Sequence, residues 1–474
     1  MSASMKRYIH IAIMFALIIV ISMMEPFGQI TPFGMKALGL FVGVLYGWIF
    51  IDLVFPSLMG FVLMPVMGLM QLLPAMSAGF GNVTFLMILP ALVFAGAMEE
   101  AGVSSFIGNW LLKQKVFRKS PWMLVIGFAI IAFVLGAAGA TMAGIFLLWS
   151  IVIKIADLTG MEKKNKLISF MIFLIVAAAY MGCYVMPFQI GALMCLGFHP
   201  VAYSYIDFFI YTMIISVVVL ALFLLAARFV LRLDVSMFAL PESVIEELEA
   251  KKATKQQKIG TVILVLYVLL LFLSSMFTQV PGMAMVAAWG IAGVSLVALL
   301  VMNFIVVDGK PIINIEQVFA KHTPWTLVLL LVVTFPLADL MKSADSGIMA
   351  TIMGSVMPMV SQLGAVPFVI VCVVALGLLT QVTHNIVLLA MFLPMLCPIA
   401  GQLGGPAMEV VLWMLLYLVL NVAYCTPAAS MPAALVHGHE YMIKKYAYTF
   451  PLIHLTIMMV ICFVIGIPLG TMMF

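Results

Sequence analysis

The sequence predicts an all-α polytopic membrane protein with about 11 transmembrane helices and two re-entrant hairpins of opposite orientation, arranged as an inverted repeat. Composition is the first reason: 66% of the 474 residues are apolar and only 8% are charged, too few charges to cover a soluble surface. The second is that apolar runs about 20 residues long, enough to cross a bilayer core, recur from end to end. The third is the distribution of basic residues.

Eleven candidate spans can be drawn along the chain. The first follows Lys6 and Arg7 and could pass for a signal peptide, but it lacks a small-residue cleavage site and many apolar runs follow, so we interpret it as a span. In chain order the spans are 8–24, 31–50, 54–73, 82–101, 167–197, 204–229, 259–279, 284–306, 324–341, 407–436 and 447–472.

Two further apolar segments, 121–153 and 364–400, are long for one crossing and short for two, which need roughly 40 residues plus a turn. If neither crosses and the N-terminus is inside, 20 of the 22 basic residues fall on the cytoplasmic side. If each crosses once, 13 fall outside. Two tight full crossings would leave the count unchanged, but the length favours hairpins, 121–153 opening inward and 364–400 outward.

The order of span, hairpin and interrupted span occurs twice, which predicts an inverted repeat. Inverted repeats with broken helices are typical of transporters, with the substrate near the midplane where the repeats meet. We therefore expect a first repeat over 1–239, a cytoplasmic linker helix over 240–258 and a second repeat over 259–474. Glu247 and Lys251 have the i,i+4 spacing of a solvated helix.

The hairpin tips and the interruptions are the predicted site. The first tip, 136–141, is rich in Gly and Ala, and the second, 380–385, is the most polar cluster inside a long apolar run. The spans 167–197 and 407–436 are interrupted around Pro187 and Pro427. The alternatives are close helix packing for the glycines, helix–helix hydrogen bonds for the polar tip, and simple kinks for the prolines.

Charged side chains are missing from both tips, which favours an anionic or neutral solute held by dipoles and hydroxyls. His384 is the one titratable group at a tip, and it could donate to a carboxylate or titrate near neutral pH. The six cysteines lie in apolar runs, so we expect packing and no disulfides, and neither they nor the 41 Met residues indicate a structural or catalytic metal.

At these residues the chain resembles the divalent anion:sodium symporter family of the ion transporter superfamily. That family carries Ser-Asn-Thr at each tip. The first tip is similar through Gly139-Ala140-Thr141, which keeps the threonine, and the second through His384-Asn385-Ile386, which keeps the asparagine. The family's Pro-containing stretches look like 186–189 and 430–433 here, and its span before the first hairpin looks like 90–102.

The resemblance implies binding roles for residues of the tips and interruptions. Those implied to bind substrate are Gly139, Ala140, Thr141, Thr383, His384, Asn385, Gln189, Ser430 and Pro432. Those implied to bind a coupling cation are Ala138, Thr141, Gly182, Met186, Pro187, Thr380, Asn385, Thr426 and Ala429.

The resemblance also implies a homodimer in which one domain is a scaffold and the other moves like an elevator, carrying di- or tricarboxylates or sulfate. No cofactor is expected, and sodium is a candidate coupling ion. Exchange without sodium, or proton coupling through His384, stays open. The chain is then a multi-pass protein of a prokaryotic plasma membrane, with a cytoplasmic N-terminus, an external C-terminus, lipid and a small anion as partners, and no nucleic acid.

Other functions predict different features. The large membrane subunit of a binding-protein-dependent carboxylate transporter would share the hairpins but need partner subunits. A membrane-embedded enzyme would need paired acids, a His-rich cluster or a Ser/His pair at one depth, and the remaining histidines lie mostly at span ends or in loops. A passive channel does not call for broken helices beside hairpins, so we expect alternating access and no enzyme activity.

Overall fold

The structure is a computed structural model that describes residues 3–474 apart from 251, 324 and 428. It is almost entirely helical, with one two-stranded ribbon, β1 (Val306–Val307) and β2 (Lys310–Pro311). Within the described residues, 11 helices are long and apolar enough to cross a membrane. The prediction of an all-α polytopic membrane protein is confirmed.

The helices of the first half reach residue 225, and the linker helix follows them. They are α1 (Ala3–Met23), α2 (Pro32–Phe50), α3 (Val54–Val66), α4 (Leu72–Phe80), α5 (Val83–Glu100), α6 (Val103–Leu112), α7 (Pro121–Ala137), α8 (Thr141–Thr159), α9 (Lys166–Tyr184), α10 (Ile190–Phe198), α11 (Tyr205–Leu225) and α12 (Glu242–Ala250).

The helices of the second half run from residue 255 nearly to the C-terminus. They are α13 (Lys255–Met276), α14 (Pro281–Phe304), α15 (Ile315–His322), α16 (Trp325–Lys342), α17 (Ile348–Val360), α18 (Ala365–Leu379), α19 (Asn385–Gly404), α20 (Pro406–Leu420), α21 (Met431–Gly438), α22 (Lys444–Ile461) and α23 (Ile467–Met473).

The predicted span 54–73 is wrong as a single helix. Its helix, α3, has only 13 residues, and the backbone of Gly68 then takes a φ of 71°, a conformation that glycine adopts without a steric penalty and that ends a helix. A separate helix, α4, follows. Conversely, α8 and α19, predicted as hairpin arms, have 19 and 20 residues and are each long enough to span.

The same order of elements follows in both halves. In the first half it is α5, α6, the α7–α8 hairpin, the interrupted pair α9 and α10, and α11; in the second it is α16, α17, the α18–α19 hairpin, α20 and α21, and α22. Gly102 before α6 and Gly347 before α17 both have positive φ, 70° and 65°. Gly102 lies against Gln257 in the first turn of α13, and Gly347 lies against Gln29 in the turn before α2. This cross-packing relates the two halves.

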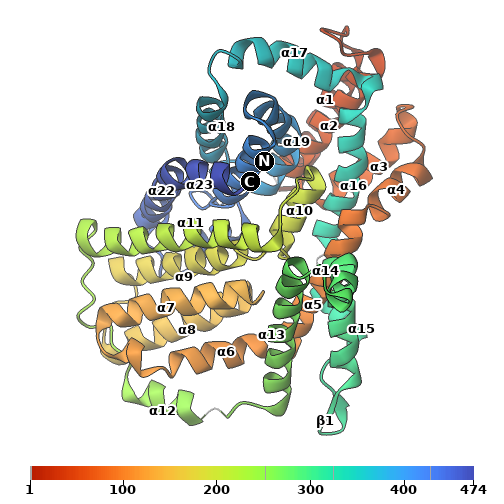
Figure 1. Cartoon of the computed structure of the whole chain (residues 1–474). Helices are drawn as coiled ribbons and strands as arrows, with labels where there is room; N and C mark the ends of the chain where they lie inside the picture. Colours follow the sequence, from red (N-terminus) through yellow and green to blue (C-terminus); the bar gives the residue numbers. More distant parts are fainter. Residues whose placement is uncertain (1–2, 251, 324, 428) are drawn as a thin grey trace.

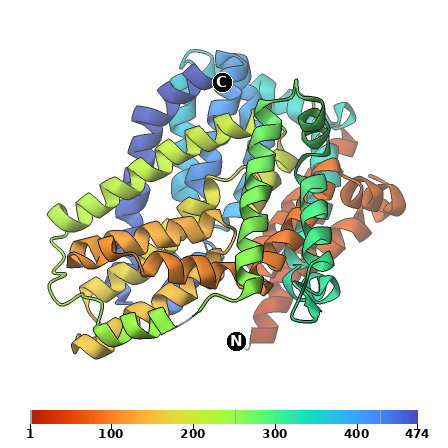
Figure 2. The ribbon, with the colours of Figure 1, turned by 60° about the horizontal axis from the view of Figure 1, so that its bottom comes forward.

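The helices can be divided into two groups. We call α1–α5 with α13–α16 the upright body, because α13 and α16 run up the view of Figure 1, and we call the remaining helices the hairpin body, because α6, α7, α9 and α11 run across it. The hairpin body holds both hairpins and both interrupted pairs. Figure 2 places the N-terminus and α12 at one edge of the molecule and the C-terminus at the opposite edge.

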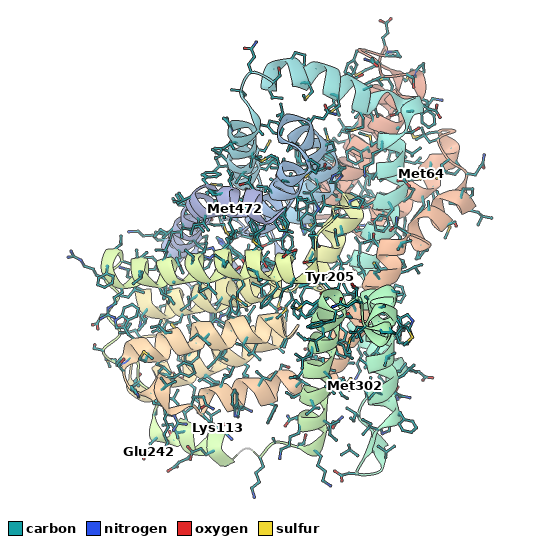
Figure 3. All side chains as sticks on the ribbon, in the orientation of Figure 1. Met64, Lys113, Tyr205, Glu242, Met302 and Met472 are labelled. Carbon is teal, nitrogen blue, oxygen red and sulfur yellow. The ribbon has the colours of Figure 1, made fainter. Side chains whose placement is uncertain are left out.

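The linker helix is shorter than predicted. α12 ends at Ala250, and residues 255–258 already belong to α13, whose start is fixed by a capping box between Thr254 and Gln257. Glu249 pairs with Arg118 at 3.5 Å and Glu247 pairs with Lys154, so α12 lies on the base of the first hairpin. Figure 3 shows this edge, marked by Lys113 and Glu242. Lys251, the predicted partner of Glu247, lies outside the described residues.

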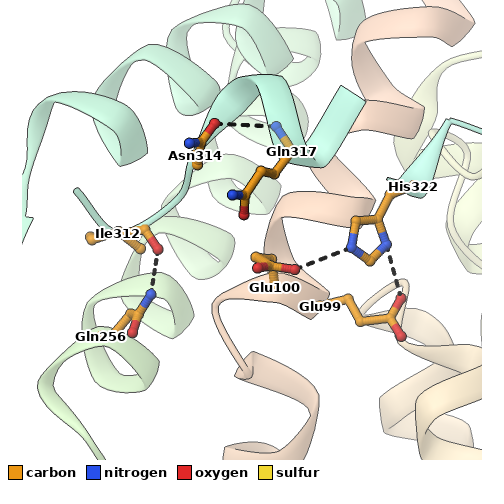
Figure 4. A network of polar contacts seen from close by, with 7 residues as sticks. All are labelled: Glu99, Glu100, Gln256, Ile312, Asn314, Gln317 and His322. Carbon is orange, nitrogen blue, oxygen red and sulfur yellow. Dashed lines mark hydrogen bonds and ion pairs between the residues drawn. The ribbon is translucent and has the colours of Figure 1, made fainter. Parts of the chain in front are cut away.

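The halves also meet where α15 contacts α5 in the upright body. His322 lies between two carboxylates, with Nδ1 3.8 Å from Glu99 and Nε2 3.4 Å from Glu100 (Figure 4). A Cβ on Gly96 would come within 2.3 Å of the His322 Cβ, so this approach requires a glycine. A second backbone feature is Gly290 inside α14, whose φ of 58° and ψ of −158° interrupt the helix.

Candidate transport site between the hairpins

The first tip is a helix end followed directly by a helix start. The Ala140 N–H donates to the Leu135 carbonyl at 2.9 Å and the Gly139 N–H to the Gly136 carbonyl at 3.0 Å, the two bonds of a Schellman motif. Gly139 supplies the left-handed residue with a φ of 81°. Ala138 is the last residue of the turn before it, and α8 begins at Thr141.

Glycines bring the first hairpin into backbone contact with α9. A Cβ on Gly136 would lie 1.8 Å from the Ala179 carbonyl oxygen, and one on Gly182 would lie 1.9 Å from that of Phe133. Neither position can therefore hold a larger residue without separating α7 from α9. Close helix packing, the alternative given for the glycines, therefore explains Gly136 and Gly182. Gly139 is needed for the turn.

The first interruption, 185–189, reaches back to the first tip. Gln189 Nε2 donates to the Ala137 carbonyl at 3.4 Å, and a Cβ on Gly139 would lie 3.4 Å from the same Nε2. The Met186 carbonyl accepts the Gln189 N–H at 3.1 Å, and Pro187 is buried. The predicted residues of this half thus gather at one place, with Gln189 as the link between hairpin and interrupted span.

The second interruption, 421–430, is held open by Gln381. This buried side chain donates from Nε2 to the Gly377 and Val422 carbonyls at 3.0 and 2.8 Å. Its Oε1 accepts the N–H groups of Tyr424 and Cys425, both at 3.2 Å. A helix would have satisfied these backbone groups itself, so one glutamine of the hairpin replaces a missing helical turn.

Further side chains join the second tip to the second interruption. Thr380 donates to the Leu420 carbonyl at 3.0 Å and Thr426 donates to the Gln381 carbonyl at 2.6 Å. The Asn385 backbone N–H donates to the Ala429 carbonyl at 3.2 Å, and its Nδ2 to Asn421 Oδ1 at 2.9 Å. The predicted residues Thr380, Asn385, Thr426 and Ala429 are therefore neighbours.

Two tyrosines connect the two interruptions. Tyr184 Oη donates to the Asn421 carbonyl at 3.1 Å, and Tyr417 Oη donates to the Tyr184 carbonyl at 3.2 Å. Both rings are buried. A continuous polar path therefore runs from the first interruption through Tyr184, Asn421 and Asn385 to the second tip, although the two tips share no hydrogen bond among the described residues.

Four helices begin at this site: α8 and α19 at the tips, α10 and α21 at the interruptions. The residues before α8, α10 and α19, which are Ala140, Gln189 and His384, make no side-chain cap. Only α21 is capped, by Ser430, with the buried Pro432 in its first turn. Uncapped N-termini leave backbone N–H groups for an anion.

His384 and Thr383 occupy the turn before α19. His384 Nδ1 is buried and has no hydrogen-bond partner in the described part of the chain, and Thr383 is half-buried. A buried nitrogen without a partner is costly and calls for an explanation. A bound solute that accepts or donates a hydrogen bond there would supply one.

The helices break at both predicted tips and at both predicted interruptions, but sequence reasoning gave no role to the residues that join them. Gln381 and Asn421 were visible only as polar residues in apolar runs, and Tyr184 and Tyr417 carried no signal, because a tyrosine in an apolar run does not show which backbone group it will bond. Within the described residues no group of three or more His, Cys, Asp or Glu side chains is placed to hold a metal ion.

Comparison with known proteins gives one result. A family model described as citrate transporter matches residues 9–423, most of the chain, including both tips and the first interruption. No curated protein matches the chain. The match confirms the resemblance at the level of the superfamily, which also contains the divalent anion:sodium symporters. The chain belongs to the citrate transporter family.

Proposed function

We propose that this protein is a secondary transporter for citrate or a closely related di- or tricarboxylate, working by alternating access. The observation that carries the proposal is the meeting of four helix N-termini at a site with no charged side chain at either tip. Each helix start has a partial positive charge and N–H groups without a partner inside the helix. Three of them lack a side-chain cap, so a tricarboxylate can offer one carboxylate to each.

Asn385, Gln189 and Thr141 are the side chains proposed to bind the substrate, with Thr383, His384 and Ser430 around them. The hydroxyls of Thr380 and Thr426 each donate to a backbone carbonyl, which leaves their lone pairs toward a cation. Sodium is a hard cation that such oxygens suit, and the carbonyls of Ala138, Met186 and Ala429 are the backbone candidates. Sodium coupling is therefore part of the proposal.

The orientation proposed is the one derived from charge. The N-terminus, the base of the first hairpin and α12 face the cytoplasm, and the base of the second hairpin and the C-terminus face outward. The chain is then a plasma-membrane protein whose halves are inverted repeats meeting at the site. A homodimer with an elevator-like movement of the hairpin body is the expected assembly.

The experiment is uptake of labelled citrate and succinate by proteoliposomes of the purified protein, with empty liposomes as the control. Uptake that needs an inward sodium gradient identifies a symporter. Uptake independent of sodium but accelerated by internal citrate identifies an exchanger. Absence of uptake of both acids under both conditions would contradict the proposed function.

A further inference from the structure

The half-helices α10 and α21 occupy equivalent places in the two halves but have unequal surroundings. α10 packs against α5 and α16 of the upright body, where the two bodies meet (Figure 1). α21 packs instead against α9 and α22 within the hairpin body, and its residues Met431, Ala434 and Gly438 are exposed. The upright body therefore covers α10, whereas one face of α21 is exposed.

A glycine of α10 lies where this helix packs against the upright body. Gly197 is the eighth residue of α10, and a Cβ there would lie 2.7 Å from the Phe335 ring of α16 and 3.1 Å from the Thr84 methyl group of α5. One residue later, Lys342 at the end of α16 donates to the Phe198 carbonyl at 3.2 Å. A cation at the last carbonyls of a helix is stabilising.

The matching residue of α21 has no such contact. Gly438 is the eighth residue of α21, and a Cβ there would meet nothing within 4 Å. Its φ does not lie in the left-handed range, so the backbone does not require glycine. Gly438 is the last residue of α21, and no close contact in this conformation requires a glycine there.

We propose that Gly197 and Gly438 are paired closure contacts, each used in one of the two states of alternating access. The state described here has the Gly197 contact made and the Gly438 contact open. In the other state α21 closes against the upright body through Gly438, and α10 moves away from Phe335. In the charge-derived orientation α10 is on the outer side, so the present state opens to the cytoplasm.

This proposal rests on the proposed function, but its test measures the conformation of the protein. Ala434 is exposed and one helical turn before Gly438, on the same face of α21. We would introduce Ala434→Cys and label it with a membrane-impermeant maleimide in inside-out vesicles. Protein without this substitution sets the background from the six native cysteines.

Gly197→Leu should hold α10 off the upright body, so labelling of Ala434→Cys should fall. Gly438→Leu should leave labelling unchanged and abolish uptake. Adding Phe335→Ala to Gly197→Leu should restore labelling, which a misfolded protein would not do. Gly282→Leu is the matched control, since a Cβ at Gly282 in α14 also meets nothing within 4 Å, and it should change neither readout.

Unchanged labelling in well-folded Gly197→Leu protein, or full uptake by Gly438→Leu, would overturn the proposal. The expected labelling pattern in a protein that moves no carboxylate would support the paired contacts and contradict only the substrate. Carboxylate uptake with no change in labelling would support the proposed substrate and contradict the paired contacts.

Discussion

Asn385 is the residue at which the second tip, the second interruption and the proposed substrate meet. Its backbone N–H and its side-chain amide are both committed, to Ala429 and Asn421, and only 8% of the residue is exposed. Its Oδ1 has lone pairs that a cation could use, and its amide is at the start of α19. Asn385 therefore joins the second tip to the second interruption and also lies where the substrate is proposed to bind.

We expect Asn385→Ala to abolish transport without unfolding the protein. The change leaves Asn421 Oδ1 without its donor, a local loss of about 1–3 kcal/mol, which a packed hydrophobic interior can tolerate. Citrate uptake and the detergent melting temperature would be measured together. Asn303→Ala, at an exposed asparagine of α14, is the control. Wild-type uptake by well-folded Asn385→Ala protein would remove Asn385 from the site.

His384 should affect the pH profile of transport. Histidine is the side chain whose charge changes near neutral pH, and its Nδ1 is buried without a partner in the described part of the chain. We expect His384→Ala and His384→Gln to change the dependence of uptake on pH, since neither replacement titrates there. Initial rates across a pH series would test this, and a profile identical to that of the wild type would exclude titration of His384.

At the scale of elements, the two interruptions are stabilised differently. The second spans ten residues and depends on Gln381, whereas the first is short and is joined to its hairpin by Gln189 at 3.4 Å. The α18–α19 hairpin and the α20–α21 pair are thus one polar unit. The α7–α8 hairpin and α9 are instead joined by close backbone packing at Gly136 and Gly182.

Gln381→Ala should therefore destabilise the protein as well as stop transport. The substitution leaves two buried carbonyls and two buried N–H groups without their partners, each loss worth about 1–3 kcal/mol. We expect a clearly lower melting temperature than that of the wild type. Gln71→Ala, at an exposed glutamine, should melt as the wild type does. Equal melting temperatures for the two variants would show that the interruption does not need Gln381.

The short helices mark the limit of prediction at this scale. The hairpins and interruptions could be predicted because their flanking charges, prolines and glycines are local signals. α6, α15 and α17 have 10, 8 and 13 residues, too short for a clear period or a span, and they form by packing on neighbours from distant sequence. The role of Gln381 was hidden for the same reason, since its four partners include residues more than 40 positions away.

At the scale of the whole molecule, the sequence was sufficient to predict the fold class. The bilayer permits few structures, so composition and run length suffice for an all-α polytopic chain. The lengths of single spans were predicted less well, as α3 shows, because one glycine or turn can end a helix. The direction of the halves depends on charge, and that prediction can be tested directly.

We expect the C-terminus to lie outside the cytoplasm. Alkaline phosphatase fused after Phe474 should be active, because its disulfides form only in an oxidising compartment, whereas the same enzyme fused within the α12 linker should be inactive. Activity at the linker and none at the C-terminus would reverse the orientation, and with it the assignment of the open side of the site.

Gly290 has a consequence for the tolerance of this chain to change. Its φ of 58° and ψ of −158° lie in a region that is essentially restricted to glycine, and a Cβ there would lie 3.6 Å from the end of the Met87 side chain. In a saturation mutagenesis of the whole protein, position 290 should reject every replacement as strictly as the hairpin tips do. Such a map would then mark a residue outside the proposed binding site, and the backbone geometry of α14 explains why.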